Sequence, residues 1–245
     1  SCEINACAAP CNSSPNLSND PVAILCCDQP FTFNNGAVDT SDRDSISYSF
    51  GKAFQNRGTE CNYASPRTYL DPITPYYPPG TSYPTAIPSA TPPIGTYLDP
   101  SSGDLIFTPT NCSEIAVVDI QMIEWRKDSL GVYKQIGVTR RDMQVIVMSC
   151  PSNNPPEVEG PYSYSVCEGN QLCFNVTTDD PAYIPPPPTP TPPPDTVKIS
   201  WNGGIPGATF TVTTPSARLQ TGRFCWTPAE GSASSLPYTF TVTAR

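Results

Sequence analysis

The sequence predicts an all-β protein made of two tandem antiparallel β-sandwich modules. Residues 26–39 (CCDQPFTFNNGAVD) match residues 167–180 (CEGNQLCFNVTTDD) without a gap, and the string at 103–109 is echoed at 222–228. A long-period repeat that combines alternating apolar residues with turn signals is typical of tandem β-modules. The 32 prolines also disfavour helices, because proline inside a helix removes a backbone hydrogen bond.

The first module is expected to span residues 12–150, after residues 1–11 that end a preceding module. Residues 51–96 are rich in proline and tyrosine and poor in strand signals, so they are expected to form a long surface loop, either ordered or mobile. Elsewhere apolar and polar residues alternate, which indicates strands with one buried face. The strands expected in this module lie at residues 31–33, 46–50, 104–108, 115–125 and 132–148.

The second module is expected to span residues 151–245 and to carry a proline-rich insertion at 181–195. The insertion contains the run PPPPTPTPPP, which favours the extended polyproline II conformation. Alternating apolar residues predict strands at residues 197–201, 210–212, 224–226 and 240–242.

The chain has 11 cysteines and no histidine. Many cysteines in a β-rich chain indicate disulfides and an oxidising, extracellular compartment. The odd count leaves at least one cysteine without a partner inside the sequence. Zinc binding is the weaker explanation, since the sequence contains neither a C-x-x-C pair nor a histidine.

The repeat suggests which cysteines pair. Cys173 aligns with Thr32 and Cys225 with Ile106, so the second module alone has a cysteine at both places. Two further pairs sit at matching positions near the linkers, one follows by elimination, and Cys27 stays open as an alternative partner. Each bond would stabilise its module by roughly 2–4 kcal/mol. The expected disulfides are Cys173–Cys225, Cys11–Cys26, Cys150–Cys167 and Cys61–Cys112.

Aspartates gather at the same place in both modules. Asp39, Asp42 and Asp44 directly follow a predicted strand, and Asp180 and Asp195 flank the insertion of the second module. Calcium prefers oxygen ligands, which short Asp-rich loops commonly supply. These five residues are therefore candidate calcium ligands. The alternative is a solvated polar turn that aspartates cap.

Several function classes are disfavoured. A net charge of −9 argues against a nucleic-acid partner, which needs a basic face. The chain lacks a run of about eighteen apolar residues, so no membrane insertion is expected in this segment. Without histidine the commonest general base is missing, and no G-x-S-x-G string is present. We therefore expect no catalytic residues and no enzyme activity.

Tyrosines of the long loop are candidate ligand contacts. Tyr76, Tyr77 and Tyr83 lie among prolines, and tyrosine on an exposed loop is suited to contact glycans or proteins. The alternative is that these rings cover their own module's sheet.

The strings CNSSPNLSNDP, YLDPSSGDLIFTPT, NNPPEVEG and GRFCWTPAEGSASSLPYTFTVTA resemble those of gliding-motility-associated surface proteins of Bacteroidetes. These are large repetitive adhesins exported by the type IX system. The resemblance covers most of the chain outside the proline-rich loops. It implies cadherin- or immunoglobulin-like modules in a cell-surface filament that adheres to a substratum. It also implies O-glycosylation at Asp-Ser/Thr-aliphatic tripeptides, with Ser45, Ser129 and Thr196 as candidate sites.

The sequence therefore predicts a structural or adhesive segment of an extracellular filament, cut from a longer exported protein. Its expected partners are neighbouring repeats of the same chain and an extracellular glycan or surface. One alternative is a carbohydrate-binding or accessory module of a secreted enzyme, which would expose coplanar aromatic rings. Another is a purely structural filament subunit, whose loops would be buried against neighbouring copies.

Overall fold

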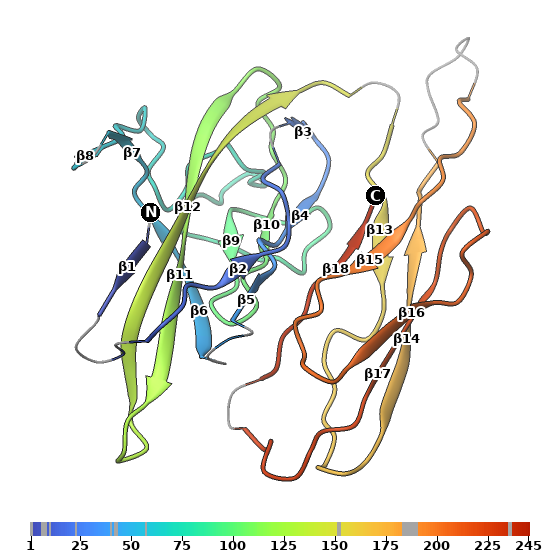
Figure 1. Cartoon of the computed structure of the whole chain (residues 1–245). Coiled ribbons are helices and arrows are strands. Elements are labelled where there is room, and N and C mark those ends of the chain that lie inside the picture. Colours follow the sequence, from blue (N-terminus) through green and yellow to red (C-terminus); the bar gives the residue numbers. More distant parts are fainter. Residues whose placement is uncertain are drawn as a thin grey trace. The chain divides into compact units, whose positions relative to one another are not determined.

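Every regular element in the described part of the computed structural model is a β-strand. The described residues are 2–5, 9, 11–22, 24–39, 41, 44–56, 58–150, 153–182, 191–234 and 237–245. They form two compact units, residues 1–149 and 150–245 (Figure 1). Within these residues, no helix is long and apolar enough to cross a membrane. The predicted all-β class with antiparallel sheets is confirmed, and one strand pair is parallel.

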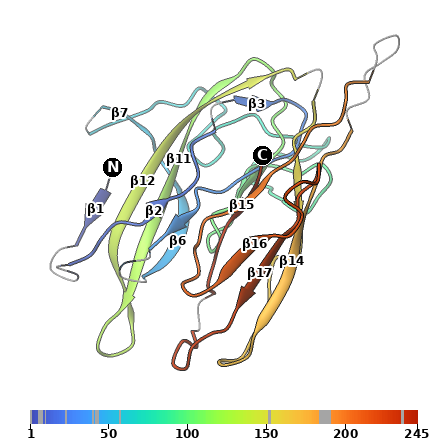
Figure 2. The ribbon, with the colours of Figure 1, turned by 45° about the vertical axis from the view of Figure 1, so that its right-hand side comes forward.

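The first unit is built on a five-stranded sheet. Its longest strands, β11 (Ile115–Lys127) and β12 (Tyr133–Met148), form the long hairpin seen in Figures 1 and 2. The remaining strands are β1 (Cys2–Ile4), β6 (Ser45–Gly51) and β3 (Ile24–Cys26), of which β3 runs parallel to β12. The segment expected to end a preceding module thus contributes β1 to this sheet.

A smaller sheet packs against the large one. It consists of β4 (Phe31–Phe33), β10 (Leu105–Phe107) and β9 (Tyr97–Leu98). Successive side chains of a strand point to opposite faces, and the inward-facing ones of both sheets share one apolar core. That core includes Phe33, Leu105, Phe107, Val118, Ile120, Met122, Met143 and Val145. Two short pairs lie beside the sheets: β2 (Asn16–Leu17) with β5 (Ala37–Val38), and β7 (Phe54–Asn56) with β8 (Thr59–Glu60).

The long proline- and tyrosine-rich loop packs on the first unit. Tyr76 N donates to Thr108 O at 2.8 Å, and Thr110 N donates to Thr74 O at 2.9 Å, which ties the loop to the end of β10. Ile73 of the same loop is fully buried in the core. This part of the loop is therefore packed against its own unit.

The second unit has a four-stranded sheet and a separate strand pair. The sheet consists, in order, of β13 (Glu157–Glu159), β14 (Leu172–Asp179), β17 (Gly222–Trp226) and β16 (Thr209–Val212). The pair is β15 (Ile199–Trp201) with β18 (Val242–Ala244). Most of the predicted insertion, residues 183–190, lies outside the described residues.

Aromatic rings fill the space between the sheet and the strand pair of the second unit. Phe224, which is 1% exposed, stacks on Phe240 with ring centroids 4.5 Å apart and on Phe174 at 5.0 Å. Trp201 of the pair meets Phe224 edge-on at 6.0 Å. Aromatic pairs of this kind stabilise a fold beyond the area that they bury.

The two units share the strand register that the sequence repeat implied. Thr32 pairs with Ile106 in the first unit, and Cys173 pairs with Cys225 in the second. These are the positions that the two repeats aligned with each other. The repeat therefore describes a common strand arrangement, and the cysteines of the second unit replace an ordinary cross-strand pair of the first.

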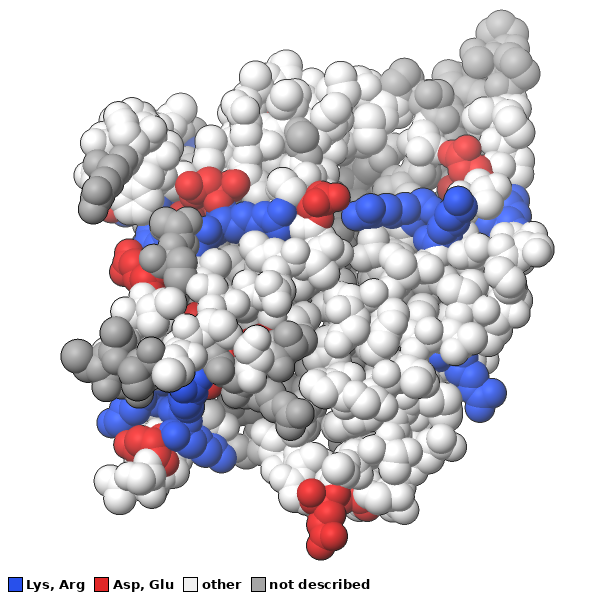
Figure 3. Space-filling view, viewed as in Figure 1, with Lys and Arg blue, Asp and Glu red and all other residues white. Residues whose placement is uncertain are grey.

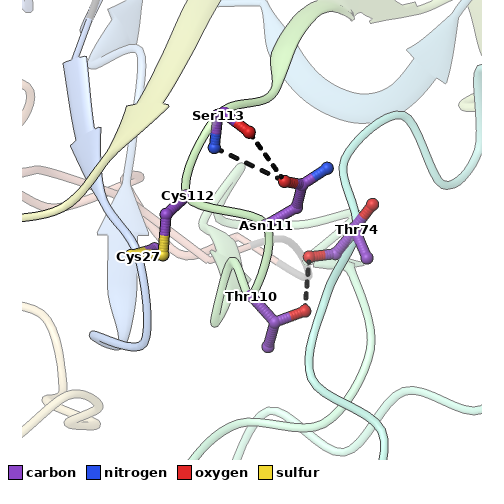
Figure 4. Close-up of a disulfide and its surroundings, with 6 residues drawn as sticks. All are labelled: Cys27, Thr74, Thr110, Asn111, Cys112 and Ser113. Atoms are coloured by element: carbon purple, nitrogen blue, oxygen red, sulfur yellow. Dashed lines mark hydrogen bonds between the residues drawn. A yellow bond between two sulfur atoms is a disulfide. The ribbon is translucent and has the colours of Figure 1, made fainter.

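A disulfide braces each unit. Cys173 and Cys225 face each other on β14 and β17 and form the expected bond, with an S–S distance of 2.05 Å. In the first unit Cys27 bonds Cys112, which lies two residues after Thr110, the residue that binds Thr74 of the long loop (Figure 4). Because bonds of this kind restrict the unfolded chain, each stabilises the unit that contains it.

The other predicted pairings are wrong. They were Cys61–Cys112, Cys11–Cys26 and Cys150–Cys167. Antiparallel pairing of β4 with β10 brings the chain before β4 beside the chain after β10, so Cys112 meets Cys27. Sequence spacing does not show which strand ends adjoin, so elimination failed. Cys26 and Cys150 are each disulfide-bonded, whereas the free thiols among the described residues are Cys11, Cys61 and Cys167.

Candidate functional site

The aspartate loop between β5 and β6 is closed by one of its own carboxylates. Asp39 directly follows β5, and its oxygens accept hydrogen bonds from the backbone N–H groups of Ser41 (3.2 Å) and Asp44 (3.1 Å). Aspartate commonly caps turns in this way. Asp42, the third predicted ligand of this loop, lies outside the described residues.

A glutamate from β11 completes an acidic cluster with this loop. Asp39, Asp44 and Glu124 each bring one carboxylate oxygen within 4.8 Å of the others. Glu124 is fully buried. Three carboxylates at this spacing could hold a metal ion, and hard cations such as calcium prefer carboxylate oxygens.

Glu124 was not predicted, although the sequence held a signal for it. It continues the buried series Ala116, Val118, Ile120 and Met122 along β11. A glutamate at an inward position of a strand is rare unless it has a partner. Only the fold shows that the partner region is the Asp39–Asp44 loop.

A guanidinium group already lies at the cluster. Arg126 donates from Nε to Asp44 Oδ1 at 2.7 Å and from Nη2 to Asp44 Oδ2 at 2.6 Å. Its Nη2 also donates to Asn12 Oδ1 at 2.8 Å, and Asn12 Nδ2 donates to Glu124 Oε1 at 3.2 Å. Both oxygens of Asp44, whose side chain is 2% exposed, are thus engaged. A metal ion would bind here only in competition with Arg126.

The second unit brings its two predicted ligands together in a hollow. Asp180 and Asp195 line a cavity of about 260 Å³, and Asn153, Asn154 and Thr196 add amide and hydroxyl oxygens to its wall. All five residues belong to the second unit. The oxygen-rich wall fits a hard cation.

Two arginines reduce the negative charge of this hollow. Arg218 Nη1 donates to Asp180 Oδ2 at 3.2 Å and to the backbone O of Asp195 at 2.9 Å, and Asp195 N donates to the same Asp180 oxygen at 3.0 Å. Arg245 also lines the cavity. These bonds hold Asp195 through its backbone.

A further buried carboxylate lies on the outer face of the first unit's large sheet. Asp119 of β11 is 1% exposed and pairs across the strands with Asp142 and with Gly51. A Cβ atom at Gly51 would lie 2.6 Å from Asp119 Oδ1, so glycine leaves room for the carboxylate. Burial and the neighbouring Asp142 raise the pKa of Asp119 to about 7, and Arg140 opposes this shift.

The raised pKa of Asp119 predicts that the first unit loses stability as the pH rises from about 4 to about 7. In this window the folded state keeps a proton that the unfolded state has lost, so unfolding becomes easier by at most about 1.4 kcal/mol per pH unit. Denaturant unfolding at several pH values measures this slope. The variant Asp119→Asn is expected to flatten it, and Asp142→Asn to reduce it. A wild-type slope unchanged in Asp119→Asn would contradict the assignment.

The predicted tyrosine contacts differ in exposure. Tyr83 is 45% exposed, whereas Tyr76 and Tyr77 are half-buried. Burial raises the pKa of the Tyr77 hydroxyl, as does nearby Asp71. Tyr76 and Tyr77 thus help to cover their own unit, and of the three only Tyr83 is largely open to a ligand.

The candidate glycosylation sites also differ. Ser129 is exposed in the turn that joins β11 to β12, and Thr196 is exposed at the hollow of the second unit. Ser45 is half-buried at the start of β6. Ser129 and Thr196 are therefore more accessible to a modifying enzyme than Ser45.

Comparisons with known proteins leave the family of this chain open. No family model matches it, and no curated protein matches it. One solved structure to which the chain is similar is the crystal structure of Dpr2 Ig1-Ig2 in complex with DIP-Theta Ig1-Ig3. The match has 12% sequence identity and covers 95% of this chain and 96% of that chain, with a TM-score of 0.28. A score this low carries no argument about fold or function.

Proposed function

We propose that this chain is a non-catalytic, structural and adhesive segment of a large extracellular filament or adhesin. The observation that carries this proposal is the covalent bracing of both β units. Cys173–Cys225 joins two directly paired strands within a sheet, and Cys27–Cys112 joins the ends of the first unit's small sheet. Such bonds keep the enclosed chain from extending under tension. They are also typical of extracellular proteins.

The sequence resemblance supports a more specific setting. The strings shared with gliding-motility-associated adhesins of Bacteroidetes favour a role in bacterial gliding or surface attachment after type IX secretion. The partners would be neighbouring repeats and an extracellular glycan or surface. Lys and Arg side chains are interspersed with Asp and Glu on the face in Figure 3. We propose no nucleic-acid partner, since nucleic acid needs a basic face.

Calcium would act in this setting as a stiffening ion. We place it in the hollow of the second unit, where Asp180, Asp195 and Asn153 would supply oxygen ligands. Its chemistry there would be purely structural, since a bound calcium ion joins carboxylates that otherwise repel. The cluster of the first unit is the weaker place, because Arg126 engages both carboxylate oxygens of Asp44, whereas Arg218 engages one oxygen of Asp180.

Single-molecule pulling tests the mechanical part of this proposal. In the oxidised chain the loop closed by Cys173 and Cys225 should stay shut. Reduction should then release roughly 180 Å of additional length from the second unit, because the 52 positions from Cys173 to Cys225 add about 3.3–3.6 Å each. The 85 positions closed by Cys27 and Cys112 in the first unit should release about 290 Å more on the same basis. If the chain extends to the same length before and after reduction, the proposed mechanical role is wrong.

Bead detachment under flow tests the adhesive part. Beads coated with the oxidised chain are expected to hold to glass or to a polysaccharide film better than beads coated with an unrelated protein of similar charge. Equal detachment of the two bead types would remove the adhesive role.

A further inference from the structure

The turns that follow Cys26 and Cys167 share a left-handed residue and a hydrogen bond. Asp28 and Gly169, which are 141 positions apart, both have a positive φ, of 60° and 75°. Asp28 N donates to Pro109 O at 2.7 Å, and Gly169 N donates to Pro228 O at 2.8 Å. Both the turn and the residue that accepts its hydrogen bond are therefore equivalent in the two units.

This equivalence places Cys26 and Cys167 at one structural position, two residues before the left-handed residue of each turn. Cys26 is half-buried and disulfide-bonded. Cys167 is exposed and carries a free thiol. The cysteine is thus disulfide-bonded in the first unit and free and exposed in the second, although the turn that follows it keeps the same positive φ and the same hydrogen bond.

The neighbourhood of Cys26 indicates what kind of partner such a position takes. Cys26 lies opposite Met148 at the end of β12, and Cys27 N donates to Met148 O at 2.9 Å. The chain then runs from Met148 to Cys150, which is also disulfide-bonded. Cys26 therefore lies beside β12, the strand that leads into the second unit. Near the start of that unit lies the disulfide-bonded Cys150.

We propose that Cys167 forms a disulfide with a cysteine near the start of an adjoining module, so that successive modules of the filament are joined covalently. This deepens the proposed function and rests on it. The partner is a second thiol, either in the same polypeptide or in a second copy of this chain, where exposed Cys11 is the equivalent cysteine. Joining two thiols removes two electrons and two protons. A disulfide oxidant of the extracytoplasmic compartment accepts them and is reduced to a dithiol.

A disulfide map of the native protein tests this proposal. The protein is extracted with iodoacetamide present, so that free thiols are blocked, and is cut after glutamate. Cleavage after Glu159 and Glu168 yields the peptide GPYSYSVCE, whose one cysteine is Cys167. We expect this peptide to be linked to a second peptide that contains a module-start cysteine. A Cys167 peptide that is blocked as a free thiol, or linked to Cys61 of its own chain, overturns the proposal.

Two further experiments show which chain supplies the cysteine that bonds Cys167. If a second copy supplies it, a mixture of Cys11→Ser and Cys167→Ser chains in a glutathione redox buffer gives a disulfide-linked dimer, whereas neither variant alone does. If another module supplies it, the mapped peptide has a sequence not found among these 245 residues. In the isolated chain Cys167→Ser should leave the melting temperature unchanged, as should the control Cys61→Ser. The disulfide map detects the Cys167 bond whether or not the protein adheres to a surface. A map without this bond would therefore contradict this proposal and leave the adhesive role to be judged separately.

Discussion

Replacing both Cys173 and Cys225 with alanine is expected to lower the free energy of unfolding of the second unit by about 4 kcal/mol. The bond closes a loop with a sequence separation of 52, and the entropy that such a closure removes from the unfolded chain corresponds to about this value. A domain of this size is commonly stable by only about 5–15 kcal/mol. Loss of the bond would therefore remove a large part of its stability.

Guanidinium unfolding followed by tryptophan fluorescence measures this effect in one unit at a time. Trp201 and Trp226 report on the second unit and Trp125 on the first, so the measurement is made in a Trp125→Phe background. The matched control is Cys61→Ala, which removes a free thiol and should shift the transition little. Equal midpoints for the double variant and the wild type would show that the bond does not stabilise the unit.

Local patterns in the sequence were enough to predict the repeat and the longest strands, β11 and β12, whereas short strands such as β1, β7 and β13 were not predicted. The alternation from Ala116 to Met122 reports which side chains face the core, because strand geometry turns every second residue inward. The alignment of Cys173 with Thr32 and of Cys225 with Ile106 worked for a related reason. Repeats that share a strand register must place aligned residues opposite each other.

Features that depend on contacts between distant segments could not be read in this way. The bond between Cys27 and Cys112 spans 85 positions and follows from which strand ends adjoin. The contacts of Arg126 with Asp44 and Asn12 join segments that lie 82 and 114 positions apart. An aspartate-rich loop predicts a positively charged partner. That partner can be a metal ion or an arginine side chain, and contacts between distant segments decide which of the two it is.

Replacing Arg126 with glutamine is expected to make the first unit depend on calcium. Without the guanidinium, Asp39, Asp44 and Glu124 keep their oxygens within 4.8 Å of one another and lose their positive partner. Breaking a buried ion pair from one side commonly costs about 3–5 kcal/mol, because a charge stays buried without compensation. Arg126 is itself 35% exposed, so the lower end of this range is expected in the presence of a chelator.

Calcium should recover most of this loss in Arg126→Gln, because the vacated position is surrounded by carboxylate oxygens. Thermal unfolding of the first unit with a chelator and with calcium at about 1 mM, the range of extracellular sites, measures the recovery. The matched control is Asp44→Asn in the Arg126→Gln background, which removes one ligand and should recover less. Asp195→Asn reports separately on the second unit, where it should abolish any response of the wild type to calcium. If Arg126→Gln melts at one temperature in chelator and in calcium, the cluster is not a latent metal site, and Arg126 serves only as an ordinary ion-pair partner of Asp44.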